Sequence, residues 1–574
     1  MSHLEKRGIH KRSTGASCRG SILAMCLLLL TAATVVWPQL TFANSTGIGE
    51  SGSARKITST TGSVAEGNIK NFVKADCIDF INERPSRVYC GFFTMPLNHD
   101  TQINSKPAGG DSVSSASGTS SITGGAVSAN TVLIPVMVAR STRGVREARN
   151  AAVLIPGGGG PGAGMGFGYS YQPGEFLASY DSLRQAGIDV VIVDQRGAGF
   201  SRPRLTCSET LVAFKAMIGK VRTINEELAG YQTAISDCRN RLQQQHIDVA
   251  HFDTRQSAMD FLAIMRELDY PTWFTIATSY ATTIAQAMVA LQPSAFDLIV
   301  LDSPVPLHYQ HPLTWERTKT AITNSIDRCV ADDSCVKRYP NLAQKLEDIL
   351  AIAAARPYLI KIRVYDDEGN IRIKTVVADD TTVLSILSTA VYYNEHISEL
   401  PQVITGVHKG LPLSLNGFAE TFWYQVTDDT YADGLNLTVH CKERQPLEES
   451  YMSANPGYHD QLSHASKLLL RSQLELCRIW RVAADADVIP RLQTDTSTLI
   501  LAGGLDPVIG SEDIEHTAEY FTNVSVETMP GAGHSIWYQH ECARDRVIDF
   551  LTSAADSATT SSAVNCDARV PGFK

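Results

Sequence analysis

Short apolar segments alternate with helical stretches along this chain of 574 residues, and this alternation limits the possible folds more than any other feature. Helical periodicity runs over Ser257–Leu268 and Thr282–Leu291, each next to apolar segments. The segments that we expect to form strands are Val88–Leu97, Thr131–Ala139, Ala151–Ile155, Asp189–Val193, Trp273–Ala277, Leu298–Leu301 and Ser497–Leu501. Strands that alternate with helices predict an α/β fold with a doubly wound, mostly parallel sheet covered on both faces.

The alternation lapses between about residues 306 and 490. There we expect helices over Trp315–Cys329, Leu342–Ala355 and Thr381–Tyr392, around a hairpin over Tyr358–Val377 that turns at Asp366–Gly369. An insertion of this kind between two consecutive core strands predicts a largely helical cap over 306–490. Ligands of open α/β sheets bind beyond the carboxyl ends of the strands, so the cap would roof a pocket there. Residues 44–305 and 491–574 would then form the core.

The first 43 residues have the pattern of an export signal. Basic residues precede an apolar run from Ile22 to Val36, which ends near the small-residue site Thr41-Phe42-Ala43. This order predicts a secretory signal peptide that is cleaved after Ala43, and hence a secreted or periplasmic protein without stable membrane association. An uncleaved membrane anchor is the alternative, but the run is short for a complete span.

Cleavage after Ala43 would leave ten cysteines. An even number in an exported chain favours disulfides, and pairing in sequence order is the simplest arrangement. The expected pairs are Cys77 with Cys90, Cys207 with Cys238, Cys329 with Cys335, Cys441 with Cys477, and Cys542 with Cys566. Zinc binding is the alternative, but no Cys-x-x-Cys or clustered Cys/His spacing supports it. We therefore expect no metal.

Composition narrows the classes of partner. Apolar residues make up 44% of the chain and charged residues 19%, which permits a large core. The net charge is −10 and the body of the chain has no polybasic run, so we expect no nucleic-acid binding. Residues 101–129 are rich in Ser, Gly, Thr and Ala, a composition that predicts a flexible loop at the tip of a hairpin.

A candidate nucleophile lies between an apolar strand and a helix. The sequence Ala277-Thr278-Ser279-Tyr280-Ala281 has the strand–turn–helix context of a nucleophile elbow, whose usual form is Gly-x-Ser-x-Gly. Alanine replaces both glycines, so the turn would be more crowded. Taken alone, this motif favours an ordinary helix N-cap serine over a nucleophile.

Two further motifs complete a possible catalytic triad. Asp506 follows an apolar strand in Leu505-Asp506-Pro507, and His534 ends the segment Pro530–His534 ahead of a helix. The order Ser279, Asp506, His534 is the order of an α/β-hydrolase triad, in which the histidine takes the serine proton and the acid orients the imidazole. Asp302, just after the strand Leu298–Leu301, is the alternative acid.

A glycine-rich turn, Gly157–Gly162, follows the strand Ala151–Ile155. Backbone N–H groups in such a turn can approach an oxyanion closely, and we assign the oxyanion hole to the N–H groups near Gly160 and of Tyr280. The spacing also fits Gly-x-Gly-x-x-Gly, but Pro161 disrupts the helix start that would bind a pyrophosphate, and no Gly-Lys-Ser/Thr follows.

These motifs together resemble the prolyl aminopeptidase and secreted tripeptidyl aminopeptidase family of α/β-hydrolases. The resemblance rests on Gly-Gly-Pro-Gly at 159–162, Asp-Gln-Arg-Gly-x-Gly-x-Ser at 194–201, the Ser279 elbow, Leu505-Asp506-Pro507 and Gly533-His534, and covers roughly residues 75–570. It implies an exported serine exopeptidase that removes short peptides or single residues from free N-termini without a metal or organic cofactor.

An aminopeptidase also needs a carboxylate for the substrate ammonium. Glu443 is our candidate, because a Cys441–Cys477 bridge would fix it near the cap–core junction; a solvated surface glutamate is the alternative. Arg196 is expected to form a structural ion pair behind the site. Two other functions stay open: a secreted carboxylesterase or lipase with the same triad, and a non-catalytic binding protein on a hydrolase scaffold.

Overall fold

The computed structural model describes residues 72–77, 86–103, 130–143, 151–164, 179–221, 224–308, 312, 314–366, 370–454, 461–485, 489–553 and 573. The predicted signal peptide, residues 104–129 of the predicted loop, and Cys566 lie outside these residues. No helix among the described residues is both long and apolar enough to cross a membrane.

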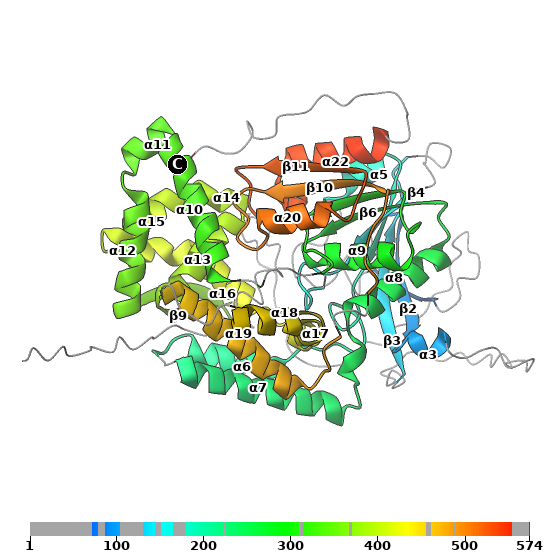
Figure 1. Ribbon diagram of the computed structural model, residues 1–574, viewed down its shortest axis with the longest axis horizontal. Helices are drawn as coiled ribbons and strands as arrows, with labels where there is room; N and C mark the ends of the chain where they lie inside the picture. The colour runs from blue at the N-terminus through cyan, green and yellow to red at the C-terminus, as the bar shows by residue number, and fades with distance from the viewer. Residues whose placement is uncertain are drawn as a thin grey trace, which may run out of the picture.

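A nine-stranded sheet forms the centre of the described structure, with strands in the order β1-β2-β3-β5-β4-β6-β7-β10-β11 (Figure 1). The strands are β1 (Phe72–Ala75), β2 (Val88–Pro96), β3 (Thr131–Ala139), β4 (Ala151–Pro156), β5 (Asp189–Val193), β6 (Thr272–Thr278), β7 (Leu298–Asp302), β10 (Ser497–Gly503) and β11 (Val524–Met529). The pairs from β5 through β4, β6, β7 and β10 to β11 are all parallel, whereas β1, β2 and β3 pair antiparallel. The predicted doubly wound, mostly parallel sheet is thereby confirmed.

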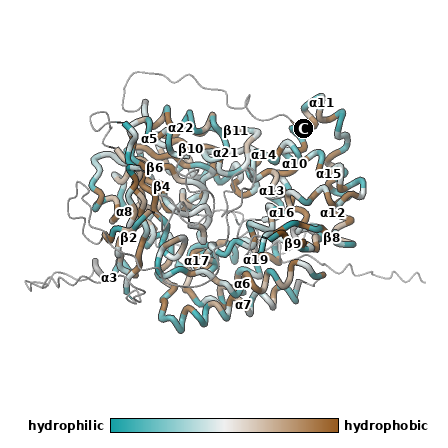
Figure 2. Tube along the Cα trace, turned by 180° about the vertical axis from the view of Figure 1, so that it is seen from behind, coloured by the Kyte–Doolittle hydropathy of each residue, from teal (hydrophilic) through white to brown (hydrophobic). Residues whose placement is uncertain are grey.

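The central strands are apolar throughout because both of their faces are buried. Successive side chains of a strand point to opposite faces. In β5, Val191 and Val193 join one hydrophobic cluster with α8 and α9, while Val190 and Ile192 join a second cluster with α5 and α22. Figure 1 shows these two pairs of helices on opposite sides of the sheet. Figure 2 shows hydrophobic residues along β4 and β6.

The core helices lie in the connections between the strands, except for the last two, which follow β11. Their bounds are α3 (Asp100–Ile103), α5 (Asp181–Gln185), α6 (Ser208–Met217), α7 (Ile224–Gln244), α8 (Thr254–Leu268), α9 (Tyr280–Leu291), α20 (Ser511–Ala518), α21 (Ile536–Gln539) and α22 (Glu541–Ser553), with a 3₁₀ turn at Val249–His251. The expected helices at 257–268 and 282–291 thus begin two or three residues earlier than predicted.

The segment between β7 and β10 is largely helical and gathers to one side of the sheet (Figure 1). Its helices are α10 (Trp315–Ala331), α11 (Asp333–Arg338), α12 (Leu342–Ala355), α13 (Asp380–Tyr392), α14 (Asn394–Ile397), α15 (Leu400–His408), α16 (Asn416–Val426), α17 (Asp433–Val439), α18 (Gln445–Ala454) and α19 (Gln461–Trp480), with a 3₁₀ turn at Pro412–Leu415 and a π-helical turn at His440–Arg444. The hairpin pairs β8 (Tyr358–Tyr365) with β9 (Ile371–Ala378), as predicted. We call this segment the cap.

Four disulfides have the partners expected from sequence order. They join Cys77 to Cys90, Cys207 to Cys238, Cys329 to Cys335, and Cys441 to Cys477. Cys542 is also disulfide-bonded. Among these bridges, the one between Cys441 and Cys477 ties the π-helical turn of the cap to α19.

The structure corrects the sequence analysis in two places. Residues 101–103 belong to helix α3 rather than to a flexible loop, because Asn98 Oδ1 accepts the Asp100 N–H at 2.8 Å and Arg255 binds the Asp100 carboxylate at 2.8 Å. The edge strands β1 and β11 were not predicted. Their side chains are partly exposed and lack the continuous apolar pattern of the central strands.

Candidate active site

Ser279 occupies the sharp turn between β6 and α9. Its φ of 57° and ψ of −130° lie in a region that residues other than glycine rarely adopt, at a cost of roughly 1–3 kcal/mol. The Ser279 N–H donates to the Asp302 carbonyl at the end of β7 (2.9 Å), which anchors the turn to the neighbouring strand. Ser279 occupies the N-cap position of α9, as the alternative expected, but its side chain makes no capping hydrogen bond.

The glycine-rich turn packs directly against this elbow. The Gly158 carbonyl accepts the Ala281 N–H at 2.7 Å, and a Cβ on Gly158 would lie 3.2 Å from the Tyr280 ring. Gly158 therefore makes the contact between the turn and the elbow. The Gly160 carbonyl instead accepts a hydrogen bond from Gln195 Nε2 at 3.1 Å. Both elbow alanines are fully buried, and their methyl groups fit within this packing. The turn thus lies beside Tyr280, the residue after the candidate nucleophile.

His534 and Asp506 meet at the carboxyl end of the sheet. Nδ1 of His534 lies 2.7 Å from Oδ2 of Asp506, and both side chains are buried. The other carboxylate oxygen of Asp506 accepts the N–H groups of Val508 (2.8 Å) and Ile509 (2.9 Å). Nε2 of His534 and Oγ of Ser279 are both buried, and neither has a hydrogen-bond partner among the described residues. A proton acceptor and a hydroxyl are therefore both left unengaged by their surroundings.

Asp302 binds the backbone next to His534, in residues 533–537, which we call the histidine loop. Its carboxylate accepts the N–H groups of Ile536 and Trp537, each at 3.0 Å. Burial raises the pKa of Asp302 to about 6, although these two hydrogen bonds oppose the shift. Since Asp302 binds the backbone of the loop and Asp506 binds the imidazole, the geometry favours Asp506 over the alternative acid.

Glu443 lies at the junction of cap and core, within the π-helical turn. Its two carboxylate oxygens accept the Thr254 N–H (2.9 Å) and the Thr254 hydroxyl (2.6 Å), at the first turn of α8. The Thr254 hydroxyl also meets the Tyr280 hydroxyl at 2.7 Å. Burial raises the pKa of Glu443 to about 7, and the neighbouring Asp253 carboxylate adds to the shift. Glu443 is half-buried and connected to Tyr280, so the solvated-surface alternative is wrong.

Arg196 is fully buried behind the elbow. Nε and Nη2 bind the two oxygens of Asp260 at 2.8 and 2.7 Å, and Nη1 donates to the carbonyls of Leu97 and His251. This bidentate pair fits the predicted structural role, because every guanidinium nitrogen is engaged away from Ser279.

Comparison with known families agrees with the fold. A family model described as "alpha/beta hydrolase fold" matches residues 151–337, and one described as "TAP-like protein" matches residues 463–562. These matches and the order of the strands show an α/β-hydrolase fold, and they support the α/β-hydrolase superfamily. The first match includes Ser279, and the second includes Asp506 and His534. No curated protein sequence matches this α/β hydrolase.

Several solved structures are similar to this α/β hydrolase. A lipase in its open form is 14% identical, with a TM-score of 0.29, and the match covers 74% of this chain and 94% of the lipase. An esterase from Exiguobacterium antarcticum is 13% identical, with a TM-score of 0.30 and coverages of 74% and 96%. A proline iminopeptidase from Mycobacterium smegmatis is 11% identical, with a TM-score of 0.32 and coverages of 75% and 97%. Likeness at these levels says nothing about the substrate.

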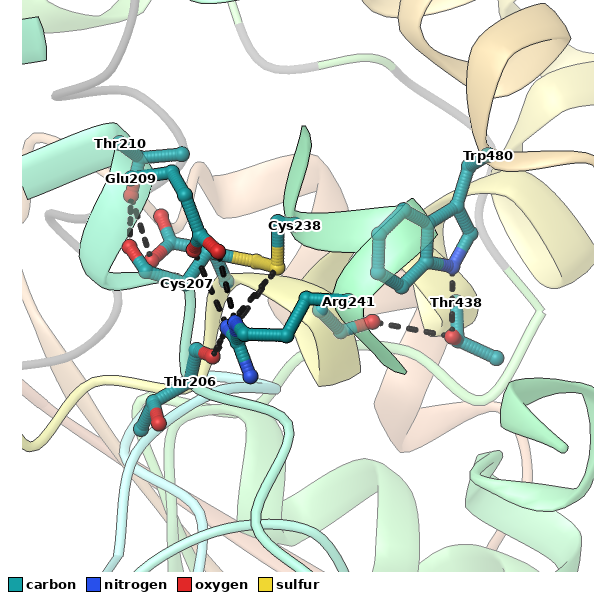
Figure 3. The surroundings of a disulfide bond; sticks show 10 residues. Thr206, Cys207, Glu209, Thr210, Cys238, Arg241, Thr438 and Trp480 are labelled. Carbon is teal, nitrogen blue, oxygen red and sulfur yellow. Dashed lines mark hydrogen bonds and ion pairs between the residues drawn. A yellow bond between two sulfur atoms is a disulfide. The ribbon is translucent and has the colours of Figure 1, made fainter. Parts of the chain in front are cut away.

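Among the described residues, one group of side chains is compact enough to hold a metal ion, and it consists of Cys207, Glu209 and Cys238. Figure 3 shows that the two sulfur atoms are joined as a disulfide, with Arg241 beside them. Arg241 also pairs with Glu209 at 2.6 Å. Zinc binds cysteine as a thiolate, and a disulfide has no thiolate. We therefore regard this group as a structural crosslink between the start of α6 and α7.

Sequence reasoning did not identify two residues that bind elements of the site. Thr254 donates a hydrogen bond to Glu443 through its backbone N–H, and Asn394 of the cap accepts the Gly533 N–H beside His534. A local signal existed for Thr254, because Asp253 caps α8 and a capping residue next to a helix start can be read from sequence. No comparable pattern surrounds Asn394.

Proposed function

We propose that this α/β hydrolase is an exported serine exopeptidase that releases short peptides or single residues from free N-termini. The observation that carries the proposal is the 2.7 Å contact between His534 and Asp506, together with the unengaged Nε2 of His534 and the unengaged Oγ of Ser279, which lies on an elbow with a positive φ. The match to the TAP-like family over 463–562 supports a peptidase.

In the proposed acylation step, Ser279 Oγ attacks the scissile carbonyl carbon and His534 Nε2 takes the hydroxyl proton. The Asp506 carboxylate can only accept hydrogen bonds when ionised, so it holds the proton on Nδ1 and stabilises the imidazolium. When the C–N bond breaks, His534 gives its proton to the leaving amine, and the N-terminal fragment remains as an ester on Ser279.

In the deacylation step, His534 takes a proton from water as the water attacks the ester, and the Ser279 hydroxyl is restored. Both steps build negative charge on the carbonyl oxygen. Tyr280 is the first residue of α9, where backbone N–H groups have no partner within the helix, and the glycine-rich turn lies beside it. We assign stabilisation of this oxyanion to the N–H groups of Tyr280 and of the turn near Gly160.

Recognition of the free N-terminus is assigned to Glu443. A carboxylate has about four acceptor positions, so the two bonds from Thr254 leave capacity for an ammonium group. The hydrogen-bond chain from Glu443 through Thr254 to Tyr280 ties this carboxylate to the residue next to the nucleophile.

Export and the absence of nucleic-acid partners belong to the same proposal. Disulfides persist in oxidising compartments, and four are present with both cysteines described, which supports a secreted or periplasmic location. The acidic net charge favours peptides with a cationic terminus over polyanions as partners.

The test measures release of a fluorogenic amine from matched peptides with free and acetylated N-termini, with Ser279→Ala as the control. The proposal predicts cleavage of the free-amine peptide alone, abolished in the variant. Equal cleavage of both peptides would contradict the exopeptidase assignment. Hydrolysis of esters but of neither peptide would indicate the carboxylesterase alternative, and no hydrolysis of any substrate would indicate a binding protein.

A further inference from the structure

The backbone of the histidine loop is held from two sides. On the core side, Ser303 Oγ accepts the Ser535 N–H at 3.0 Å, next to the two N–H groups that Asp302 accepts. On the cap side, Asn394 Oδ1 accepts the Gly533 N–H at 2.7 Å, and the Tyr392 carbonyl accepts the His534 N–H at 3.2 Å. The N–H groups of His534 and the residue before it therefore depend on the cap.

The cap approaches the loop as closely as backbone atoms allow. A Cβ on Gly533 would lie 2.0 Å from the Val391 carbonyl oxygen, so only glycine fits there. The Tyr392 and His534 rings lie 4.8 Å apart between centroids. Gln539 completes the connection: its Oε1 accepts the Asn394 N–H at 2.7 Å, and its Nε2 donates to the carbonyls of Tyr392 and His534.

We infer that Asn394 is a positioning residue through which the cap sets the position of His534 for proton transfer. The inference rests on the proposed role of His534 as the general base, but it does not depend on the substrate being a peptide. Asn394 Oδ1 is the acceptor for the Gly533 N–H, and the Tyr392 carbonyl is the acceptor for the His534 N–H, so the two bonds fix the two successive peptide units that lead into His534. A shift of these units would move the imidazole relative to Ser279, and proton transfer is sensitive to such displacements.

The variant Asn394→Leu has a similar volume but no acceptor, and Asn394→Asp keeps the acceptor oxygen. Glu395→Ala alters the neighbouring exposed residue and serves as the matched control. We would measure the rate of covalent labelling by a fluorophosphonate, and kcat and KM for p-nitrophenyl acetate, with all variants at the same pH. Rates are normalised to folded protein by circular dichroism and thermal unfolding.

In Asn394→Leu we expect labelling and kcat to be about tenfold lower, with KM unchanged. In Asn394→Asp both rates should recover to within about threefold of wild type. In Glu395→Ala neither rate should change. Wild-type rates per folded molecule in Asn394→Leu would overturn the inference. Should that variant not fold, an Asn394→Asp rate about tenfold below wild type would overturn it instead, and recovery would support it.

These outcomes separate the inference from the proposed function. A wild-type protein that reacts with the fluorophosphonate but cleaves no peptide contradicts the exopeptidase assignment and leaves the Asn394 comparison decisive. A wild-type protein that does not react with the fluorophosphonate contradicts both.

Discussion

The Asp506 carboxylate lies 2.7 Å from Nδ1 of His534, while its other oxygen accepts two backbone N–H groups. The imidazole and the two backbone N–H groups thus hold both oxygens of this carboxylate in place. Because an ionised carboxylate cannot donate, this contact requires a proton on Nδ1, and Nε2 is then available for the proposed role as base.

Asp506→Asn is expected to lower kcat by a factor on the order of 10³ to 10⁴, because the amide can present N–H to the ring and favour the wrong tautomer. Steady-state kinetics on an ester or peptide substrate would measure this loss. The expected loss is in kcat rather than in folding.

Asp302→Asn provides the comparison for that variant. Its amide has one acceptor where the loop offers two N–H donors, so we expect lower thermal stability by about 1–3 kcal/mol and a smaller loss of kcat per folded molecule. A larger kcat loss in Asp302→Asn than in Asp506→Asn would reassign the catalytic acid.

The central strands and three residues of the candidate site could be proposed from sequence because each has a local pattern. Buried parallel strands such as β5 are apolar throughout, and Ser279, Asp506 and His534 each follow such a strand or precede a helix in a fixed chain order. The contact of Asn394 with Gly533 joins residues 139 positions apart. Much of the surrounding cap contact uses backbone carbonyls, which leave no side-chain pattern to read.

Gly533→Ala tests the closeness of cap and histidine loop. The new methyl would overlap the Val391 carbonyl oxygen, so the cap or the loop must move, and we expect reduced thermal stability together with at least a tenfold loss of activity. Gly417→Ala in α16 is the matched control, because its Cβ meets nothing within 4 Å and alanine favours a helix by up to about 1 kcal/mol. Equal, unaffected activity in both variants would contradict the close approach.

The pH dependence of KM tests Glu443. Its pKa is raised to about 7, so it is neutral below that pH and ionised above it. For a substrate with a free α-amino group, KM is expected to fall as pH rises through about 7, and to rise again above about 8 as the substrate amine loses its charge. Glu443→Gln should remove the fall near pH 7, since its amide can keep the Thr254 contacts without titrating. An unchanged pH profile in that variant would remove Glu443 from substrate binding.

The Cys441–Cys477 bridge closes a separation of 36 residues, and the Cys329–Cys335 bridge one of 6. Chain entropy alone predicts that replacing each pair by serine costs about 4 and about 2 kcal/mol of unfolding free energy, respectively. Denaturant unfolding would measure both. The first replacement should also raise KM, because that bridge anchors the turn that carries Glu443; an equal KM change in the second would point to a general effect on the cap.

The measurement that tests the central claim most directly is fluorophosphonate labelling followed by intact mass determination and peptide mapping. The triad account predicts one adduct per chain, located on Ser279, and loss of labelling in Ser279→Ala and His534→Ala. An adduct on another residue, or labelling that persists without His534, would contradict a serine nucleophile activated by the His534–Asp506 pair.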